Sequence, residues 1–120
     1  MRIVPLALAA VVLVGCGEDS TSPPLAAPPD VLIVNGASTM GANAYDPSSL
    51  TISLTAKSSV KWRNNDPMVP NHTITSNTGA FDSGAVADGE TYTFNFTTVG
   101  TYPYHCSVHP SMVGTITVNP

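Results

Sequence analysis

The chain has 120 residues, of which 42% are hydrophobic and only 10% are charged. That length allows one small domain, and the hydrophobic content is enough for a core and too high for a disordered chain. Four basic residues against eight acidic ones give a formal charge of −4, which argues against a nucleic-acid partner because counterion release needs a basic face. The two cysteines, Cys16 and Cys106, belong to different parts of the chain, so no disulfide framework is predicted.

The N-terminal residues have the features of an export signal. A short positive start precedes an apolar run at residues 3–14, which has the length of a signal-peptide core and is too short to span a bilayer. The run ends at Cys16 in a pattern that resembles the lipobox of bacterial lipoproteins. The resemblance implies that residues 1–15 are a signal peptide that is removed, and that Cys16 then carries a lipid. An ordinary secretory signal is the alternative, and both place the protein outside the cytoplasm, in the periplasm or on the cell surface.

Residues 16–29 are predicted to be a tether. Prolines are frequent between residues 17 and 29 and no apolar period is present, which is typical of a partly extended linker. Such a segment suits a domain that is held away from a membrane surface. The remaining residues, 30–120, are predicted to form the folded domain.

Alternating apolar and polar residues in this domain predict strands and no helix of ten residues or more. The alternating or apolar runs lie at residues 31–34, 50–55, 60–63, 72–75, 91–97, 102–106 and 116–118. Turn signals separate them at 46–47, 77–79, 88–89 and 99–100. Roughly seven to eight short strands in a domain of this size predict an all-β fold, a Greek-key β-sandwich.

The stretch that ends the domain carries the chemistry. Cys106, His109 and Met112 bring a thiol, an imidazole and a thioether together, with two residues between each. A soft thiolate, imidazole nitrogens and a weak thioether are the donors of a blue-copper site. The domain has a second imidazole upstream at His72, so the full donor set is present.

The strand pattern indicates which histidines face inward. His72 is in phase with apolar Ile74, and Cys106 is in phase with Tyr104, so both are expected to point into the sandwich. His105 is out of phase with Cys106 and must face the other way. His105 is therefore not expected to be a ligand, and His109 on the following loop is.

Each candidate also has an ordinary structural interpretation. Taken singly, Cys106 is a buried free thiol, His72 a hydrogen-bonded histidine at a strand end, His109 a loop residue and Met112 part of the core. The joint spacing and phase favour a metal over four separate roles. Zinc is a weaker candidate because it would want more thiolate or imidazole and no thioether. A binuclear copper centre would need a second cysteine in the domain.

The domain resembles the cupredoxins, and within them the amicyanin and plastocyanin group. The resemblance covers roughly residues 45–118 and includes Tyr45-Asp46-Pro47, Val60-x-Trp62, Asn71-His72, Phe81-Asp82-Ser83-Gly84 and the run from Gly100 to Cys106. The two-residue gap between His109 and Met112 is similar to the short ligand loop of amicyanins. The resemblance implies one type 1 copper ion with His72, Cys106, His109 and axial Met112 as ligands.

Two residues depart from the family pattern. Thr73 follows His72 where plastocyanins and amicyanins usually have Asn, which leaves the side-chain link between the two ligand loops open. Val108 stands where proline is frequent, and we expect it to loosen the second loop slightly.

Such a site has no ligand position that is obviously free for a substrate. The predicted function is therefore the transfer of single electrons through Cu(I) and Cu(II) outside the cytoplasm, and the protein is not expected to be an enzyme. His109 lies beyond the strand, so its ring should reach the surface and mark where redox partner proteins dock transiently. The surrounding apolar patch is predicted from Met68, Val69, Pro110, Met112 and Val113. We expect the domain to act as a monomer.

Two rival functions belong to other classes. A copper-binding or copper-delivery protein would use the same ligands without a redox partner, and its copper should exchange readily. A hydrolase would use Cys106 as nucleophile with His109 or His72 as base. The hydrolase is disfavoured because Cys106 points into the sandwich and no oxyanion-hole motif accompanies it.

Overall fold

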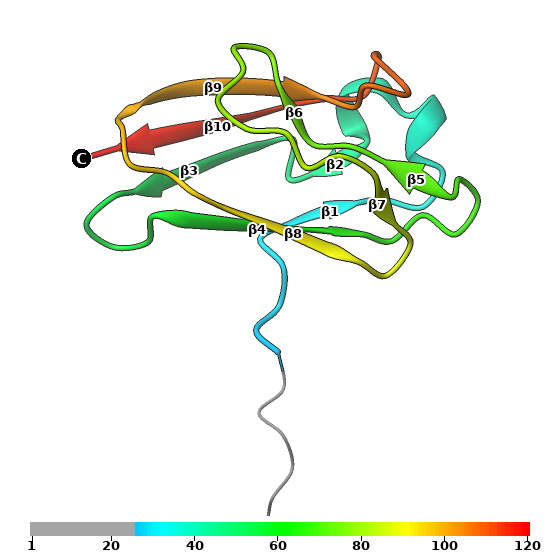
Figure 1. The fold of residues 1–120 in the computed structure, drawn as a ribbon, viewed down its shortest axis with the longest axis horizontal. Coiled ribbons are helices and arrows are strands. Elements are labelled where there is room, and N and C mark those ends of the chain that lie inside the picture. The colour runs from blue at the N-terminus through cyan, green and yellow to red at the C-terminus, as the bar shows by residue number, and fades with distance from the viewer. Residues whose placement is uncertain (1–25) are drawn as a thin grey trace, which may run out of the picture.

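β-Branched and aromatic residues alternate with polar ones along much of the chain, and these runs become strands in the computed structural model, which describes residues 26–120. The strands are β1 (Val31–Ile33), β2 (Tyr45–Asp46), β3 (Ser49–Ser53), β4 (Ser59–Asn64), β5 (Asn71–His72), β6 (Thr75–Ser76), β7 (Val86–Ala87), β8 (Thr91–Asn95), β9 (Gly100–His105) and β10 (Val113–Asn119). Two short 3₁₀ helices, η1 (Ala37–Thr39) and η2 (Gly41–Asn43), connect β1 to β2. Figure 1 shows these elements along the chain.

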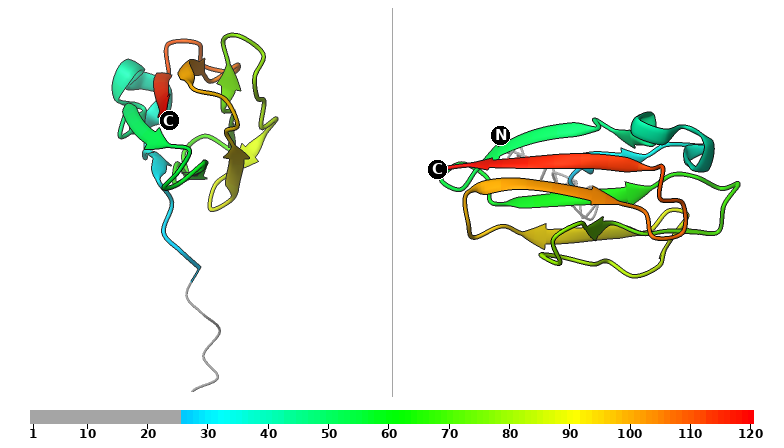
Figure 2. Two further views of the ribbon diagram at one scale, coloured as in Figure 1. Left: turned by 90° about the vertical axis from the view of Figure 1, so that its left-hand side faces the viewer. Right: turned by 90° about the horizontal axis from the view of Figure 1, so that it is seen from above.

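Two four-stranded sheets pack face to face. One has the order β2-β1-β4-β8 and the other β3-β10-β9-β6, and β5 pairs with β7 beside them. The views from the end and from above show the two layers (Figure 2). β1 runs parallel to β4 and β10 runs parallel to β3, while the other pairs are antiparallel. The predicted all-β Greek-key sandwich is confirmed, with ten short strands in residues 26–120.

An aromatic cluster forms the centre of the core. Trp62 of β4 and Tyr104 of β9 face each other across the two sheets with ring centroids 5.7 Å apart. Tyr45 of β2 packs on Tyr104 edge to face at 4.8 Å. Gly114, opposite Tyr104 on β10, leaves room for this ring, because a Cβ there would lie 2.4 Å from the tyrosine Cζ. The core thus reaches to the end of the sandwich where β9 and β10 are joined.

The predicted strand at residues 72–75 is interrupted. His72 closes β5 and Thr75 opens β6, and these two strands pair with different partners. Thr73 alternates with inward-facing His72 and Ile74, which predicts an outward side chain, but it is buried instead. Its hydroxyl accepts a hydrogen bond from the backbone N–H of Ser107, which is a contact between loops that no alternation of residue types can show. The strands β2 and β7 were also not predicted, because two residues are too few to show a period.

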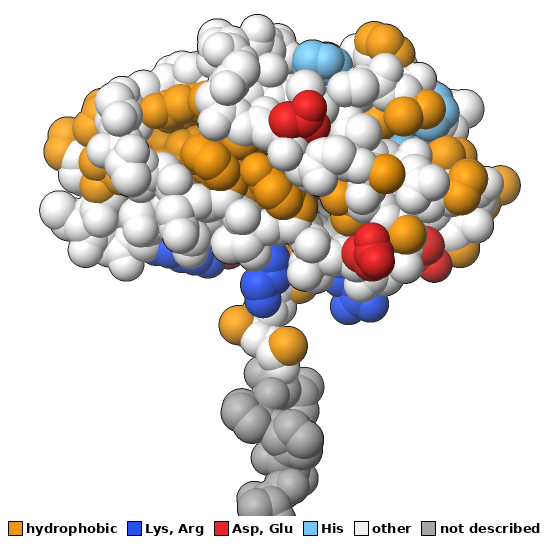
Figure 3. All heavy atoms as spheres, viewed as in Figure 1, with side chains coloured by type: hydrophobic (Ala, Val, Ile, Leu, Met, Phe, Trp, Pro, Cys, Tyr) orange, Lys and Arg blue, Asp and Glu red, His pale blue; other side chains and the backbone are white. Residues whose placement is uncertain are grey.

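The chain enters the domain on the face formed by β1, β4 and β8 (Figure 1). Asp30 ties the entering segment to β4, because its carboxylate accepts a hydrogen bond from the Lys61 N–H and pairs with the Lys57 ammonium. Blue side chains in Figure 3 lie beside the point of entry. The predicted signal peptide and Cys16 lie outside the described residues. Within residues 26–120, no helix has the length and apolar character needed to cross a membrane.

Candidate metal centre

Three of the predicted ligands meet at one end of the sandwich. His72 ends β5, Cys106 follows β9, and His109 lies on the loop that connects β9 to β10. The Cys106 Sγ lies 3.8 Å from the Nδ1 of His72 and 4.0 Å from the Nδ1 of His109. The three donor atoms all lie within 4.8 Å of one another. Both imidazoles therefore turn the same nitrogen toward the sulfur.

Burial differs among these residues. His72 and Cys106 are fully buried, whereas His109 is half-buried. Met112, the fourth predicted ligand, is also fully buried. It closes a tight loop, because its N–H donates to the His109 carbonyl at 2.9 Å and its own carbonyl accepts from the Cys106 N–H at 3.1 Å. Two backbone hydrogen bonds thus hold Cys106, His109 and Met112 in one compact turn.

Thr73 links the two ligand loops. Its Oγ1 accepts a hydrogen bond from the Ser107 N–H at 2.8 Å, and its own N–H donates to the Cys106 Sγ at 3.3 Å. The side-chain link that the sequence left open is therefore present, with threonine in place of the usual asparagine. The second contact places a backbone N–H donor directly on the sulfur that is the predicted ligand.

The opposite edge of the His72 ring faces a buried carboxylate. The His72 Nε2 lies 3.0 Å from the Asp66 Oδ2, and both side chains are fully buried. Sequence reasoning missed this residue. Asp66 lies between Asn65 and Pro67, a composition typical of an exposed turn, and no spacing in the sequence indicated that the carboxylate is buried.

Two tyrosines lie close to the donors. The Tyr45 hydroxyl donates to the Thr73 carbonyl at 2.7 Å. Burial, followed by the nearby Cys106 and Tyr104, raises the pKa of Tyr45 well above its ordinary value. Burial raises the pKa of Tyr104 to about 12, against a smaller opposing effect of Trp62. Both hydroxyls thus stay neutral at physiological pH and add no charge beside the thiol.

The structure also places His105, Tyr102, Met68 and Met112. His105 points away from the cluster, as predicted, and its Nδ1 lies 2.6 Å from the Asn77 Oδ1. Tyr102 donates from its hydroxyl to the Thr98 carbonyl at 2.7 Å, in the manner of a tyrosine corner. Met68 is 76% exposed and contributes to the surface. Met112 was expected in the apolar surface patch, and this is wrong because it is fully buried.

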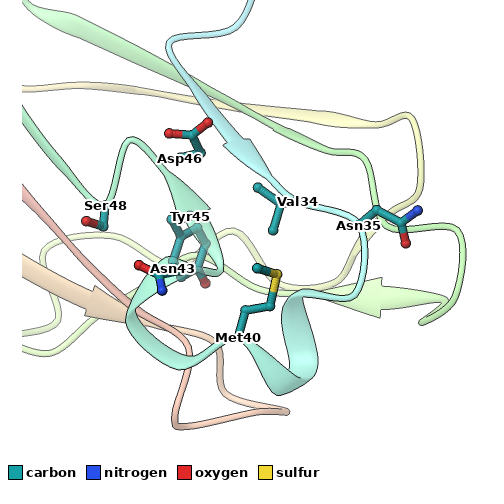
Figure 4. A pocket seen from close by; sticks show the side chains of 7 residues that line it. All are labelled: Val34, Asn35, Met40, Asn43, Tyr45, Asp46 and Ser48. Carbon is teal, nitrogen blue, oxygen red and sulfur yellow. The ribbon is translucent and has the colours of Figure 1, made fainter.

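A pocket of about 500 Å³ lies beside the site, between β1, β2 and the two 3₁₀ helices (Figure 4). It is lined by Val34, Asn35, Met40, Asn43, Tyr45, Asp46 and Ser48. None of the four predicted ligands lines it, and its polar groups are two amides, two hydroxyls and one exposed carboxylate. The pocket is therefore separate from the donor cluster.

The donor set fits copper. One buried thiol with an N–H donor on its sulfur and two imidazoles that turn their Nδ1 atoms toward it supply the soft and borderline ligands that copper accepts in both oxidation states. A buried thioether is available at Met112 on the same loop. The edge of the His72 ring that faces away from the sulfur is held by the Asp66 carboxylate. Metal-bound histidines usually have an outer hydrogen-bond partner of this kind.

Known proteins are similar to the chain over most of its length. It is 38% identical to a plastocyanin of Scenedesmus fuscus over 102 residues, which is 74% of this chain and 99% of that protein. The novel purple cupredoxin of Nitrosopumilus maritimus is 31% identical with a TM-score of 0.64, covering 74% of this chain and 97% of the other.

Two further solved structures match with lower similarity. The reduced W45Y mutant of amicyanin is 26% identical with a TM-score of 0.52, covering 60% of this chain and 70% of that chain. The copper-containing nitrite reductase of Thermus scotoductus SA-01 is 27% identical with a TM-score of 0.60, covering 75% of this chain but only 22% of that longer chain. The family model of the cupredoxin-like domain matches residues 7–118. The chain therefore belongs to the cupredoxin-like family, whose members bind one type 1 copper ion.

Proposed function

We propose that this protein is a blue copper electron carrier, with His72, Cys106, His109 and Met112 as the ligands of one copper ion. The observation that carries the proposal is the cluster of three donor atoms within 4.8 Å of one another at the end of a rigid sandwich. The bound ion would supply one reversible Cu(I)/Cu(II) electron. The surrounding hydrogen bonds hold the donors in place, so little rearrangement would accompany the change of oxidation state.

The described site suits a carrier better than an enzyme. His72, Cys106 and Met112 are fully buried, so no substrate can reach them from solvent. The pocket beside the site contains none of the four ligands. A buried Cys106 without an open approach likewise gives no support to the hydrolase alternative. The nitrite reductase match spans a small part of that protein and supports the shared fold.

His109 is the proposed point of electron exchange. It is the half-buried member of the cluster, and exposed apolar side chains lie on the two ligand loops and at the start of β10. We define the port patch as Met68, Val108 and Val113, which are 76%, 57% and 41% exposed. Hydrophobic side chains gather near a histidine at this end of the molecule (Figure 3). A small apolar patch of this kind suits brief docking of a redox partner to a monomeric domain.

The N-terminal proposal concerns location. We propose that residues 1–15 are a signal peptide, that a lipid on Cys16 anchors the protein to a membrane outside the cytoplasm, and that 16–29 tether the domain of 30–120. The support is the lipobox-like sequence together with the place where the chain enters the domain. That place lies on the sheet of β1, β4 and β8, away from the loop that carries His109 (Figure 1). An anchored domain would thus keep its port patch accessible.

The function is tested by the visible spectrum and by redox titration of the copper-loaded protein. An electron carrier should show an intense absorption band when oxidised, lose it on addition of one electron equivalent and regain it on reoxidation. Copper that leaves readily to a chelator, without reversible bleaching, would support the copper-delivery alternative. Persistent thiol reactivity of Cys106 in the loaded protein would support the hydrolase alternative.

The anchor is tested separately in a bacterial host. Expressed with its own N-terminal residues, the protein should partition with membranes, and Cys16→Ala should release it or block its processing. A mature chain that mass spectrometry shows to be unmodified would remove the lipid from the proposal.

A further inference from the structure

We propose that Asp66 is a positioning residue that holds the His72 ring for metal binding, and that its buried negative charge favours the oxidised over the reduced site. This inference rests on the proposed function for its redox consequence. Its structural part, the orientation and tautomer of the His72 ring, concerns the metal-free chain as well. Neither the family pattern in the sequence nor the ligand spacing pointed to this residue.

The carboxylate is held by several hydrogen bonds. Its Oδ2 accepts from the Ala37 N–H at 3.1 Å and faces the His72 Nε2 at 3.0 Å, while its Oδ1 accepts from the Met68 N–H at 3.1 Å. The Asp66 N–H in turn donates to the Asn64 Oδ1 at 3.0 Å. These contacts join η1, β4 and the ligand loop around one fully buried side chain. The carboxylate is therefore fixed in position before any metal binds.

This arrangement decides which His72 nitrogen carries the proton. A carboxylate can only accept hydrogen bonds, so the Nε2 that faces Asp66 must be the protonated nitrogen of the neutral ring. The Nδ1 is then left with its lone pair, and it is the atom that faces the Cys106 Sγ at 3.8 Å. Asp66 thus selects the tautomer that a metal needs and fixes the direction of the donor atom.

The Asp66 carboxylate also places a negative charge beside His72, which a neutral acceptor such as an amide oxygen would not do. Two backbone N–H groups, of Ala37 and Met68, and the His72 ring all face the buried carboxylate, and such donors stabilise its charged form. Among the ion pairs of residues 26–120, none joins Asp66 to a lysine or arginine. The negative charge is therefore compensated by the two backbone N–H donors and the His72 N–H, and not by a basic side chain. A buried anion in that place stabilises the site more when the metal carries the higher charge.

Asp66→Asn tests the charge, because it keeps the shape and one acceptor oxygen. The measurement is the affinity of the purified protein for Cu(II) and for Cu(I), each by competition with a chelator. We expect the ratio of the Cu(II) to the Cu(I) affinity to fall by about tenfold or more, the size of effect that outer hydrogen-bond partners of ligands have. A tenfold change in this ratio corresponds to a rise of about 59 mV in the midpoint potential.

Two variants separate this role from a merely structural one. Asp88→Asn removes the same charge from an exposed position and should leave the affinity ratio unchanged. Asp66→Glu keeps the buried charge and should restore much of the ratio. If Asp66→Asn lowers only the thermal stability while the ratio stays within twofold of the parent protein, the redox part of the proposal is overturned.

A measurement on the unaltered protein covers the case in which the variants fail to fold. The ¹⁵N shifts of the His72 ring in the metal-free protein report the tautomer directly. We expect the proton on Nε2, and a proton on Nδ1 would overturn the positioning role. This result does not depend on electron transfer, whereas the absence of an intense visible band would defeat the proposed function and leave the tautomer result standing.

Discussion

The two ligand loops reach the same centre by different means. The upstream loop, residues 64–73, holds His72 with buried polar groups: the Asp66 carboxylate on one edge of the ring and the Thr73 hydroxyl bound across to Ser107. The downstream loop, residues 106–112, is held by its own short backbone hydrogen bonds and leaves His109 half-buried. One imidazole is thus fixed inside the protein and the other is presented at its surface.

This difference suits the two tasks of the proposed electron carrier. A buried ligand with a fixed outer hydrogen bond keeps the donor geometry constant between oxidation states. An imidazole at the surface offers a short route for the electron to a docked partner. In the proposed function, the upstream loop provides rigidity and the downstream loop provides access, and each assignment can be tested by substitution.

The largest effect is expected from Cys106→Ser, which removes the thiolate that both loops surround. The intense visible band of the copper-loaded protein should disappear completely, because the band requires the sulfur donor. His105→Gln is the control, since His105 is the neighbour of Cys106 but points to Asn77 and away from the cluster. A band that survives Cys106→Ser, or vanishes in His105→Gln, would show that the centre is wrongly assigned.

The second effect concerns access to His109 across the port patch, to which the upstream loop contributes Met68. Met68→Lys places a like charge on both port patches when two copies meet, so electron self-exchange between oxidised and reduced protein should slow about tenfold at low salt. NMR line broadening of mixed samples measures this rate. Val99→Lys is the matched control, because Val99 is 50% exposed in the turn between β8 and β9, at the other end of the sandwich. Equal slowing by both substitutions would contradict docking at the port patch.

The third effect concerns the bond between the loops. Thr73→Val keeps the side-chain shape but removes the acceptor for the Ser107 N–H, and we expect the free energy of unfolding of the metal-free protein to fall by about 1 kcal/mol. Denaturant titration measures the change. Thr93→Val, at an exposed position on β8, should alter the stability by less than about 0.5 kcal/mol. If the two variants are equally stable, the link between the loops contributes nothing.

The smallest effect at neutral pH concerns the contribution of the buried tyrosines Tyr45 and Tyr104 to the stability of the domain. Tyr45 and Tyr104 have pKa values raised by burial, that of Tyr104 to about 12, so folding favours their neutral forms. Their contribution to stability should be complete below the ordinary tyrosine pKa of about 10 and should be lost as the pH rises toward 12. Denaturant titrations of the metal-free protein between pH 8 and 12, with tyrosinate absorbance, check this. Ionisation of all four tyrosines near pH 10 in still folded protein would contradict the prediction.

Much of the fold could be predicted because the signals are local. The period of two in β3, β4, β8 and β9 places hydrophobic residues on one face, and turn residues mark the ends of these strands. The same alternation correctly predicted that Cys106 faces inward and that His105 faces outward. The two-residue strands β2 and β7 were not predicted. They are defined by pairing with a partner strand and are too short to show a pattern of their own.

The sequence by itself determined the kinds of donor atom and their order, since Cys106, His109 and Met112 are close along the chain and can meet only within one loop. Only the tertiary structure decided what surrounds His72. Asp66 and Thr73 have the residue types of ordinary turns and strands, and their roles arise from contacts with η1 and with Ser107, which are distant along the chain. Burial of a polar group depends on which segments pack over it, and that is a property of the assembled sandwich that local patterning does not contain.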